Sequence, residues 1–178
     1  MTAQVRWLDG EEQAAWRSFL DSHQLLMSKL DAELREASPL GLTEYTVLVR
    51  LSESDDHALR MATLAADTGL SRSRLTHIVS RLEERGIVCR DKSPEDRRGV
   101  QCRLTEDGFA LLRETAPVHV GGVREHLVDL LSREQIEQMT SIFTTVLAHM
   151  RALPSRSGRT PAACPGPVAP RSAPDTQT

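Results

Sequence analysis

The chain has 178 residues, of which 39% are hydrophobic, 26% are charged and only 3% are aromatic, and its formal net charge is −3. This size and apolar fraction suffice for one globular domain, and the composition favours a mainly helical fold with little sheet. No run of about 18 apolar residues is present, and residues 1–12 lack the apolar core of a signal peptide. We therefore expect a cytoplasmic protein that has no membrane partner.

The first predicted helix begins after Asp9, because Asp9 and Glu12 have the spacing of a capping box. Apolar residues recur at helical spacing from there to Ala37, and the Ser-Pro-Leu-Gly segment 38–41 ends the helix. A helix of roughly 28 residues is long for a small domain. Its apolar stripe therefore needs a partner of similar length.

The next segments predict a helix-turn-helix arrangement. Thr43 is the predicted N-cap of a second helix over residues 44–52, and the extended piece 59–61 is expected to add a third strand to a small sheet. Residues 62–68 are predicted to form a compact helix that ends in a tight turn at Gly69. A further helix follows this turn, as the arrangement requires.

The helix after the turn carries a basic face. Ser71 is a good N-cap, and the predicted helix runs over residues 72–85 until Gly86 ends it. The spacing i, i+3, i+4 and i+7 places four apolar residues on one face, namely Leu75, Ile78, Val79 and Leu82. The other faces carry hydrogen-bond donors, namely Arg72, Ser73, Arg74, His77 and Arg81.

A charged hairpin is predicted after Gly86, where the apolar period changes from 3.6 to 2. The two predicted strands cover residues 87–91 and 100–104, and a polar loop over residues 93–99 joins them as a wing. From Arg72 through Arg103 the chain has nine Lys or Arg against five Asp or Glu. A phosphate backbone would therefore meet positive local charge within a chain that is net negative.

The three cysteines, Cys89, Cys102 and Cys164, have neither the spacing of a zinc site nor the density of a disulfide scaffold. One interpretation is that two of them are small apolar strand residues and the third is a tail thiol. A second interpretation stays open. If the wing folds back around Glu95 and Asp96, Cys89 and Cys102 lie opposite each other, where a cross-strand pair can sense oxidation.

Two more helices and a tail complete the chain. Thr105 is the predicted cap of a long helix in which Pro117 indicates a bend, and Ser132 is the predicted cap of the last helix. Six of the nine prolines fall after residue 153, so we expect residues 152–178 to be a disordered tail. Residues 1–10 are expected to be flexible, which leaves residues 11–151 as the folded domain.

The wing sequence Asp-Arg-Arg-Gly at 96–99, followed by Leu-Thr-Glu-Asp-Gly at 104–108, comes after Ser-Arg-Leu-Glu-Glu-Arg-Gly-Ile-Val at 80–88. This pattern resembles the MarR family of winged helix-turn-helix transcriptional regulators over about residues 11–151. The resemblance implies a mainly α fold. In it, a winged helix-turn-helix module with a small β-hairpin wing (43–105) lies between long dimerisation helices (11–37 and 106–151).

The resemblance also implies a function, that of a sequence-specific regulator of double-stranded DNA. We expect a repressor that acts as a homodimer on a pseudo-palindromic operator and is released by a small phenolic or aromatic ligand. The basic helix would enter the major groove, and Arg98, oriented by Asp96, would enter the minor groove. The residues expected to contact DNA are Ser71, Arg72, Ser73, Arg74, His77, Arg81, Asp96, Arg97 and Arg98. The residues expected to line the ligand pocket are Trp16, His23, Met27 and Tyr45.

Other functions have weaker support in the sequence. The sequence has no Gly-rich phosphate loop, His-Glu-x-x-His motif or nucleophile elbow, so we expect neither an enzyme nor a cofactor. His119 and His126, near Glu125 and Asp129, make a metal-responsive regulator one alternative. A redox-responsive regulator is another, although the first long helix, where the redox branch of the family carries its cysteine, has none. The third alternative is a winged helix that binds proteins, and the basic face argues against it.

Overall fold

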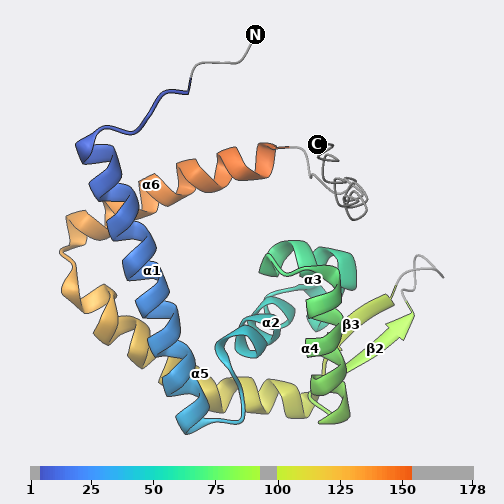
Figure 1. The fold of residues 1–178 in the computed structure, drawn as a ribbon. Coiled ribbons are helices and arrows are strands. Elements are labelled where there is room, and N and C mark those ends of the chain that lie inside the picture. The colour runs from blue at the N-terminus through green and yellow to red at the C-terminus, as the bar shows by residue number, and fades with distance from the viewer. Residues whose placement is uncertain (1–4, 93–99, 154–178) are drawn as a thin grey trace, which may run out of the picture. The chain divides into compact units, whose positions relative to one another are not determined.

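The computed structural model describes residues 5–92 and 100–153. The chain is mainly helical with a small three-stranded sheet, which confirms the predicted fold class (Figure 1). Residues 1–132 and the part from Arg133 onward form two compact units, which are described separately. In the first unit the elements are α1 (Gly10–Ala37), α2 (Leu42–Ser52), the 3₁₀ helix η1 (Asp55–His57), β1 (Ala58–Arg60), α3 (Met61–Thr68), α4 (Arg72–Glu84), β2 (Val88–Lys92), β3 (Val100–Leu104), α5 (Glu106–His126) and η2 (Val128–Leu130).

The second unit contributes α6 (Arg133–Ala152), in which none of the residues is buried. Within the described ranges, no helix has the length and hydropathy needed to cross a membrane. Several large apolar side chains of α6 are exposed, namely Ile142, Phe143, Val146, Leu147 and Met150. The N-terminal half of α1 is similar, since Trp16, Phe19 and Leu20 are also exposed. Each unit therefore carries a helix with several exposed apolar side chains.

The N-termini of the first two helices are fixed by carboxylates. In α1, Asp9 Oδ1 accepts from the Glu12 amide at 2.9 Å and Glu12 Oε2 accepts from the Asp9 amide at 3.0 Å, which confirms the predicted capping box. The predicted Thr43 cap of α2 is wrong, because the N-cap is Gly41. Glu44 Oε2 accepts from the Gly41 amide at 3.1 Å, which is the half of a capping box that needs no side chain on the N-cap residue.

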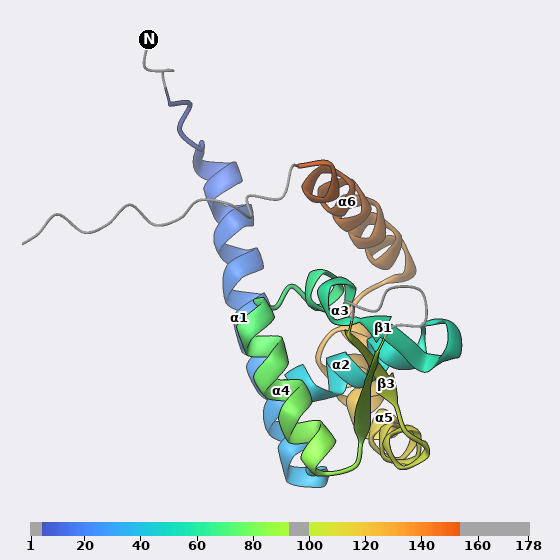
Figure 2. The same ribbon diagram turned by 90° about the vertical axis from the view of Figure 1, so that its right-hand side faces the viewer.

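The core of the first unit is built around α2, which packs against α1, α3, α5, β1 and β3. Figure 1 and Figure 2 show α2 surrounded by these elements. Its apolar face is fully buried at Val47, Leu48 and Leu51, and Tyr45 is nearly so. Buried leucines outside α2 complete this core, namely Leu34, Leu40, Leu64, Leu75, Leu82, Leu104 and Leu112. The position of α1 is therefore set by contact with α2, and α4 is placed by its packing on α3 and β2.

The helix-turn-helix forms as predicted. Gly69 ends α3 with a φ of 66°, a left-handed conformation that favours glycine, and Ser71 Oγ accepts from the Arg74 amide at 3.2 Å to begin α4. A second left-handed glycine, Gly86, follows α4 with a φ of 71°. All four residues of the predicted apolar face are buried, namely Leu75, Ile78, Val79 and Leu82. The polar residues of α4 are consequently directed outward.

The sheet is antiparallel with the strand order β1-β3-β2, so the predicted third strand is confirmed. Its register differs from the expectation for the cysteines, because Cys89 lies opposite Arg103 and Cys102 lies opposite Arg90. A shift of one residue moves a side chain to the other face of a sheet. Here the inward face is set by the buried residues Cys102 and Leu104, while Cys89 is half-buried on the other face. The second interpretation of the sequence, in which Cys89 and Cys102 lie opposite each other, is therefore wrong.

The start of α5 is locked onto the chain just after α4. The Thr105 hydroxyl lies 2.7 Å from the Gly86 carbonyl oxygen and 2.9 Å from that of Ile87, and it accepts from the Gly108 amide at 3.0 Å. Gly108 itself is buried against the Ile87 carbonyl group. From there α5 continues through Pro117 as one helix, as predicted, and Figure 1 shows it changing direction along its length.

Replacing Gly108 tests this close approach. A Cβ atom at Gly108 would overlap the Ile87 carbonyl oxygen, so Gly108→Ala should lower the free energy of unfolding by about 1 to 3 kcal/mol. Gly121→Ala in the same helix meets nothing within 4 Å and should be neutral or stabilise by up to about 1 kcal/mol. Urea unfolding of both variants makes the comparison. Equal stability of the two would contradict the packing described for Gly108.

Candidate nucleic-acid interface

The N-terminal half of α4 presents a row of exposed polar side chains. Ser71, Arg72, Ser73, Arg74 and His77 are all exposed, while the opposite face of the helix is buried. Arginine donates bidentate hydrogen bonds that match guanine, and serine and histidine both donate and accept. The row can therefore read base edges in a major groove, which is wide enough to admit an α-helix.

Arg81 differs from these residues because it has a partner within the protein. Its Nη2 lies 3.3 Å from Glu44 Oε1 on α2. The Glu44 side chain is only 12% exposed, whereas that of Arg81 is 65% exposed. Arg81 was an expected DNA contact, whereas Glu44 was not predicted, because only the folded chain brings Glu44 close to Arg81.

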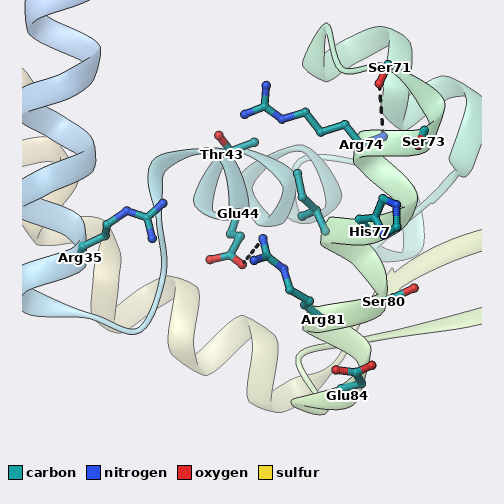
Figure 3. A pocket seen from close by; sticks show the side chains of 11 residues that line it. Arg35, Thr43, Glu44, Ser71, Ser73, Arg74, His77, Ser80, Arg81 and Glu84 are labelled. Carbon is teal, nitrogen blue, oxygen red and sulfur yellow. Dashed lines mark hydrogen bonds and ion pairs between the residues drawn. The ribbon is translucent and has the colours of Figure 1, made fainter.

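A groove of about 680 Å³ runs along α4 (Figure 3). One wall carries the expected DNA contacts Ser71, Ser73, Arg74, His77 and Arg81. The other wall contains Arg35 from the end of α1 and Thr43 and Glu44 from the start of α2. Arg35 was not predicted at this site either, because it lies on the helix expected to form the dimer.

A carboxylate holds Arg35 in place. Arg35 Nε donates to Asp31 Oδ2 at 2.7 Å, and Asp31 Oδ1 accepts from the Leu42 amide at 2.7 Å. The hydrogen bond from Arg35 lowers the pKa of Asp31, and the same hydrogen bond raises the pKa of Arg35. The ion pair therefore stays charged over the physiological range and connects α1 to the first turn of α2.

The wing residues Asp96, Arg97 and Arg98 lie outside the described residues, so their roles stay predictions. At the base of the hairpin, Arg90 Nε donates to Glu83 Oε2 at 2.8 Å, which joins β2 to α4 and lowers the pKa of Glu83. Arg103 Nη1 donates to the Asp56 carbonyl oxygen at 2.6 Å. Some of the basic residues counted between Arg72 and Arg103 thus have partners within the protein. The charge count alone therefore overstates the positive charge that is available to DNA.

The expected ligand-pocket residues occupy two different settings. Trp16 and His23 lie on α1 before and after Phe19, and the centroid of each ring is 5.9 Å from that of the Phe19 ring. Met27 is half-buried farther along the same helix. Tyr45 is buried in α2, with its ring centroid 4.6 Å from that of His119 on α5. The pocket assignment stays a prediction, and Tyr45 is its buried member.

The two histidines of the metal alternative have separate partners. His126 Nε2 lies 2.7 Å from Glu33 Oε1 on α1, and this contact lowers the pKa of Glu33. His119 packs on Tyr45, and burial lowers its pKa. Asp129 pairs with Arg124. In residues 5–92 and 100–153, no three His, Cys, Asp or Glu side chains come together in a way that would hold a metal ion.

The thiols of the redox alternative are poorly suited to reaction. Burial raises the pKa of Cys102 to about 12, and burial together with the nearby Asp91 carboxylate raises the pKa of Cys89. The reactive form of a cysteine is the thiolate, which both shifts disfavour at neutral pH. Together with the observed register, these shifts argue against a cross-strand redox pair.

Comparison with known proteins agrees with this architecture. The model of the MarR family matches residues 40–100. Sco3205, a MarR family transcriptional regulator from Streptomyces coelicolor whose structure is of a complex with DNA, is 40% identical to this chain. The two superpose with a TM-score of 0.80 over 86% of this chain and 95% of that one. AbsC, a second regulator of this family from the same organism, is 38% identical, with a TM-score of 0.78 over 84% of this chain and 100% of its own.

A curated relative is more distant. The transcriptional repressor MprA of Escherichia coli (strain K12) is 29% identical over 110 residues, which are 61% of this chain and 62% of MprA. The chain thus spans less than two thirds of that relative's length. The similarity to Sco3205 and AbsC, in contrast, covers 95% and 100% of those two chains. On these grounds the chain belongs to the MarR family.

Proposed function

We propose that this chain is a sequence-specific, double-stranded DNA-binding transcriptional regulator, and that it acts as a repressor. The observation that carries the proposal is the exposed polar row on α4, held outward by the burial of the opposite face. The similarity to Sco3205, whose structure contains DNA, and the description of MprA as a repressor support it.

In the proposed complex, α4 enters the major groove with its N-terminal half. Arg72, Ser73, Arg74 and His77 contact base edges, and Ser71 and Arg81 contact phosphates. The wing loop reaches the adjacent minor groove, where Arg98 gains from the negative potential between the two backbones. Asp96 orients Arg98, and Arg97 lies between them in the sequence.

Replacing Arg74 tests base readout. Arg74→Ala should weaken binding to the operator by about 1 to 3 kcal/mol and relax the preference at one position in each half-site. Binding to a shuffled duplex should change much less, because base contacts contribute little to non-specific affinity. Fluorescence anisotropy at fixed salt, with the DNA upstream of the chain's own gene as the operator source, measures both affinities.

The matched control is Arg50→Ala, which removes an arginine that pairs with Glu53 at the far end of α2, away from the groove. This variant should bind both duplexes as the unmodified chain does. An equal loss on the operator and the shuffled duplex with Arg74→Ala would mean that Arg74 contacts phosphate rather than bases.

The proposed regulator is a homodimer. The support is the exposed apolar stripe of α6 and the exposed apolar residues on the N-terminal half of α1. Exposed apolar surface of this extent is typical of protein interfaces. A two-fold dimer would cover both stripes and present two copies of α4 to successive major grooves of a pseudo-palindromic operator.

A charge placed in the α6 stripe should abolish dimerisation and DNA binding together. Ile142→Asp and Leu147→Asp each put a carboxylate where the partner would bury it without a counter-charge. The control is Ser141→Asp, which lies on the opposite face of the same helix. Light scattering gives the oligomeric state, and anisotropy gives DNA affinity. Dimers that persist in both stripe variants would contradict the proposed interface.

A small aromatic effector is the last part of the proposal. Among the described residues, two buried side-chain atoms have no hydrogen-bond partner, Thr115 Oγ1 and His119 Nδ1, and the His119 ring lies against Tyr45. Buried polar atoms without partners are costly, so a ligand that supplied hydrogen bonds here would be favoured. An aromatic ring with a phenol or carboxylate group has the required chemistry.

Salicylate is a suitable probe of this part. Salicylate should raise the melting temperature of the chain, because it binds the folded state. It should lower the affinity for the operator if it binds the DNA-free conformation more tightly than the DNA-bound one. His119→Phe keeps a ring against Tyr45 but removes the unpaired nitrogen, so this variant should bind DNA and lose the response to salicylate. If salicylate changes neither the melting temperature nor DNA affinity, the effector class is wrong.

A further inference from the structure

Two arginines on the groove are each held by a carboxylate that also caps the start of α2. Asp31 pairs with Arg35 and accepts from the Leu42 amide at 2.7 Å. Glu44 pairs with Arg81 and accepts from the Gly41 amide at 3.1 Å. Both guanidinium groups, one from α1 and one from α4, are thereby fixed relative to the first turn of the same helix.

Glu44 lies between these two arginines (Figure 3). Its side chain is nearly buried, whereas the side chains of Arg35 and Arg81 are 62% and 65% exposed. The Glu44 charge also contributes to the raised pKa of Arg35, after the larger effect of Asp31. The guanidinium of Arg35 lies against Gly41, where a Cβ atom would overlap Arg35 Nη2. The carboxylate is therefore covered while the cationic groups face the solvent.

This arrangement suits an anion that approaches from the groove. A guanidinium has five N–H donors, so an arginine that donates to a carboxylate can still donate to another acceptor. The positive end of the α2 dipole lies at the same place, and Gly41 has no side chain to cap it. Arg74 and His77 line the opposite wall of the groove. A DNA strand whose bases met α4 would pass its phosphates along this groove.

We propose that Glu44 is a positioning residue for DNA binding, which holds Arg81 so that Arg81 and Arg35 together grip one backbone phosphate at the start of α2. The proposal rests on the proposed function and adds Arg35 as a DNA contact. Holding a long side chain in its binding conformation reduces the rotamer entropy lost when DNA binds. An acidic residue on the DNA-facing surface thereby strengthens binding.

The sign of the Glu44→Gln effect separates this role from simple repulsion. Removing a negative charge near DNA should tighten binding if the carboxylate only repels phosphate. If Glu44 positions Arg81, Glu44→Gln should weaken binding about tenfold, the equivalent of one hydrogen bond to a charged group. Because a phosphate contact carries no sequence information, the loss should be equal on the operator and on a shuffled duplex.

A double-mutant cycle with Arg81 tests the mechanism. Arg81→Ala should weaken binding and reduce the slope of log affinity against log salt by about one. Adding Glu44→Gln to Arg81→Ala should then cause no further loss, because no guanidinium remains for Glu44 to hold. Glu53→Gln is the matched control, since Glu53 pairs with Arg50 at the other end of α2. This control should leave affinity unchanged or slightly tighter.

Melting temperatures establish that each variant is folded. Glutamine at position 44 keeps an oxygen for the Gly41 amide, so its melting temperature should stay close to that of the unmodified chain. If Glu44→Gln does not fold, the Arg35→Ala variant tests the proposed phosphate contact instead. This variant should fold, because Asp31 can still accept from the Leu42 amide. Arg35→Ala should weaken binding to both duplexes and reduce the salt slope by about one.

Two results would overturn the inference while leaving the proposed function intact. One is a folded Glu44→Gln or Arg35→Ala variant that binds as tightly as the unmodified chain or more tightly. The other is a loss of DNA affinity from Glu44→Gln that is equally large in the unmodified chain and in the Arg81→Ala variant. That result would assign Glu44 a purely structural role. If the unmodified chain binds neither duplex, the proposed function itself fails.

Discussion

The burial of α2 is the constraint on which the rest of the first unit depends. This helix of eleven residues packs against α1, α3, α5, β1 and β3, and its residues Val47, Leu48 and Leu51 are inaccessible to solvent. Because α3 packs on α2 and α4 follows α3 through a tight turn, the basic face of α4 is oriented by a core that contains none of the basic residues. The first turn of α2 also anchors Arg35 and Arg81, so one short helix sets both walls of the groove.

The features that sequence analysis predicted correctly depend on local chemistry. The start of α1 follows from the Asp9 capping box, and the buried face of α4 follows from helical periodicity. The errors involve partners distant in sequence. Thr43 was predicted as a cap because hydroxyl residues are good caps, but Asp31, eleven residues before Leu42, supplies one of the hydrogen bonds. The register of Cys89 was wrong by one residue because the burial of β3 against the core decides it.

The same distinction holds for the candidate site. The polar row on α4 is readable from the sequence because its residues belong to one helix. Arg35 and Glu44 are not readable in this way, since they reach the groove from α1 and α2 only after the chain has folded. Charge counting also fails without tertiary structure, because it treats Arg90 as available although Glu83 binds it.

The Leu-Thr-x-x-Gly motif by which the sequence resembles its family has a mechanical meaning in this structure. The hydroxyl of Thr105 meets the two carbonyl groups that follow α4, and Gly108 lets the backbone of α5 rest directly on one of them. No flexible side chain separates the two segments at that point. The start of α5 and the two residues that follow α4 and its cap are therefore in direct backbone contact. The motif thus ties the position of the long helix α5 to that of α4.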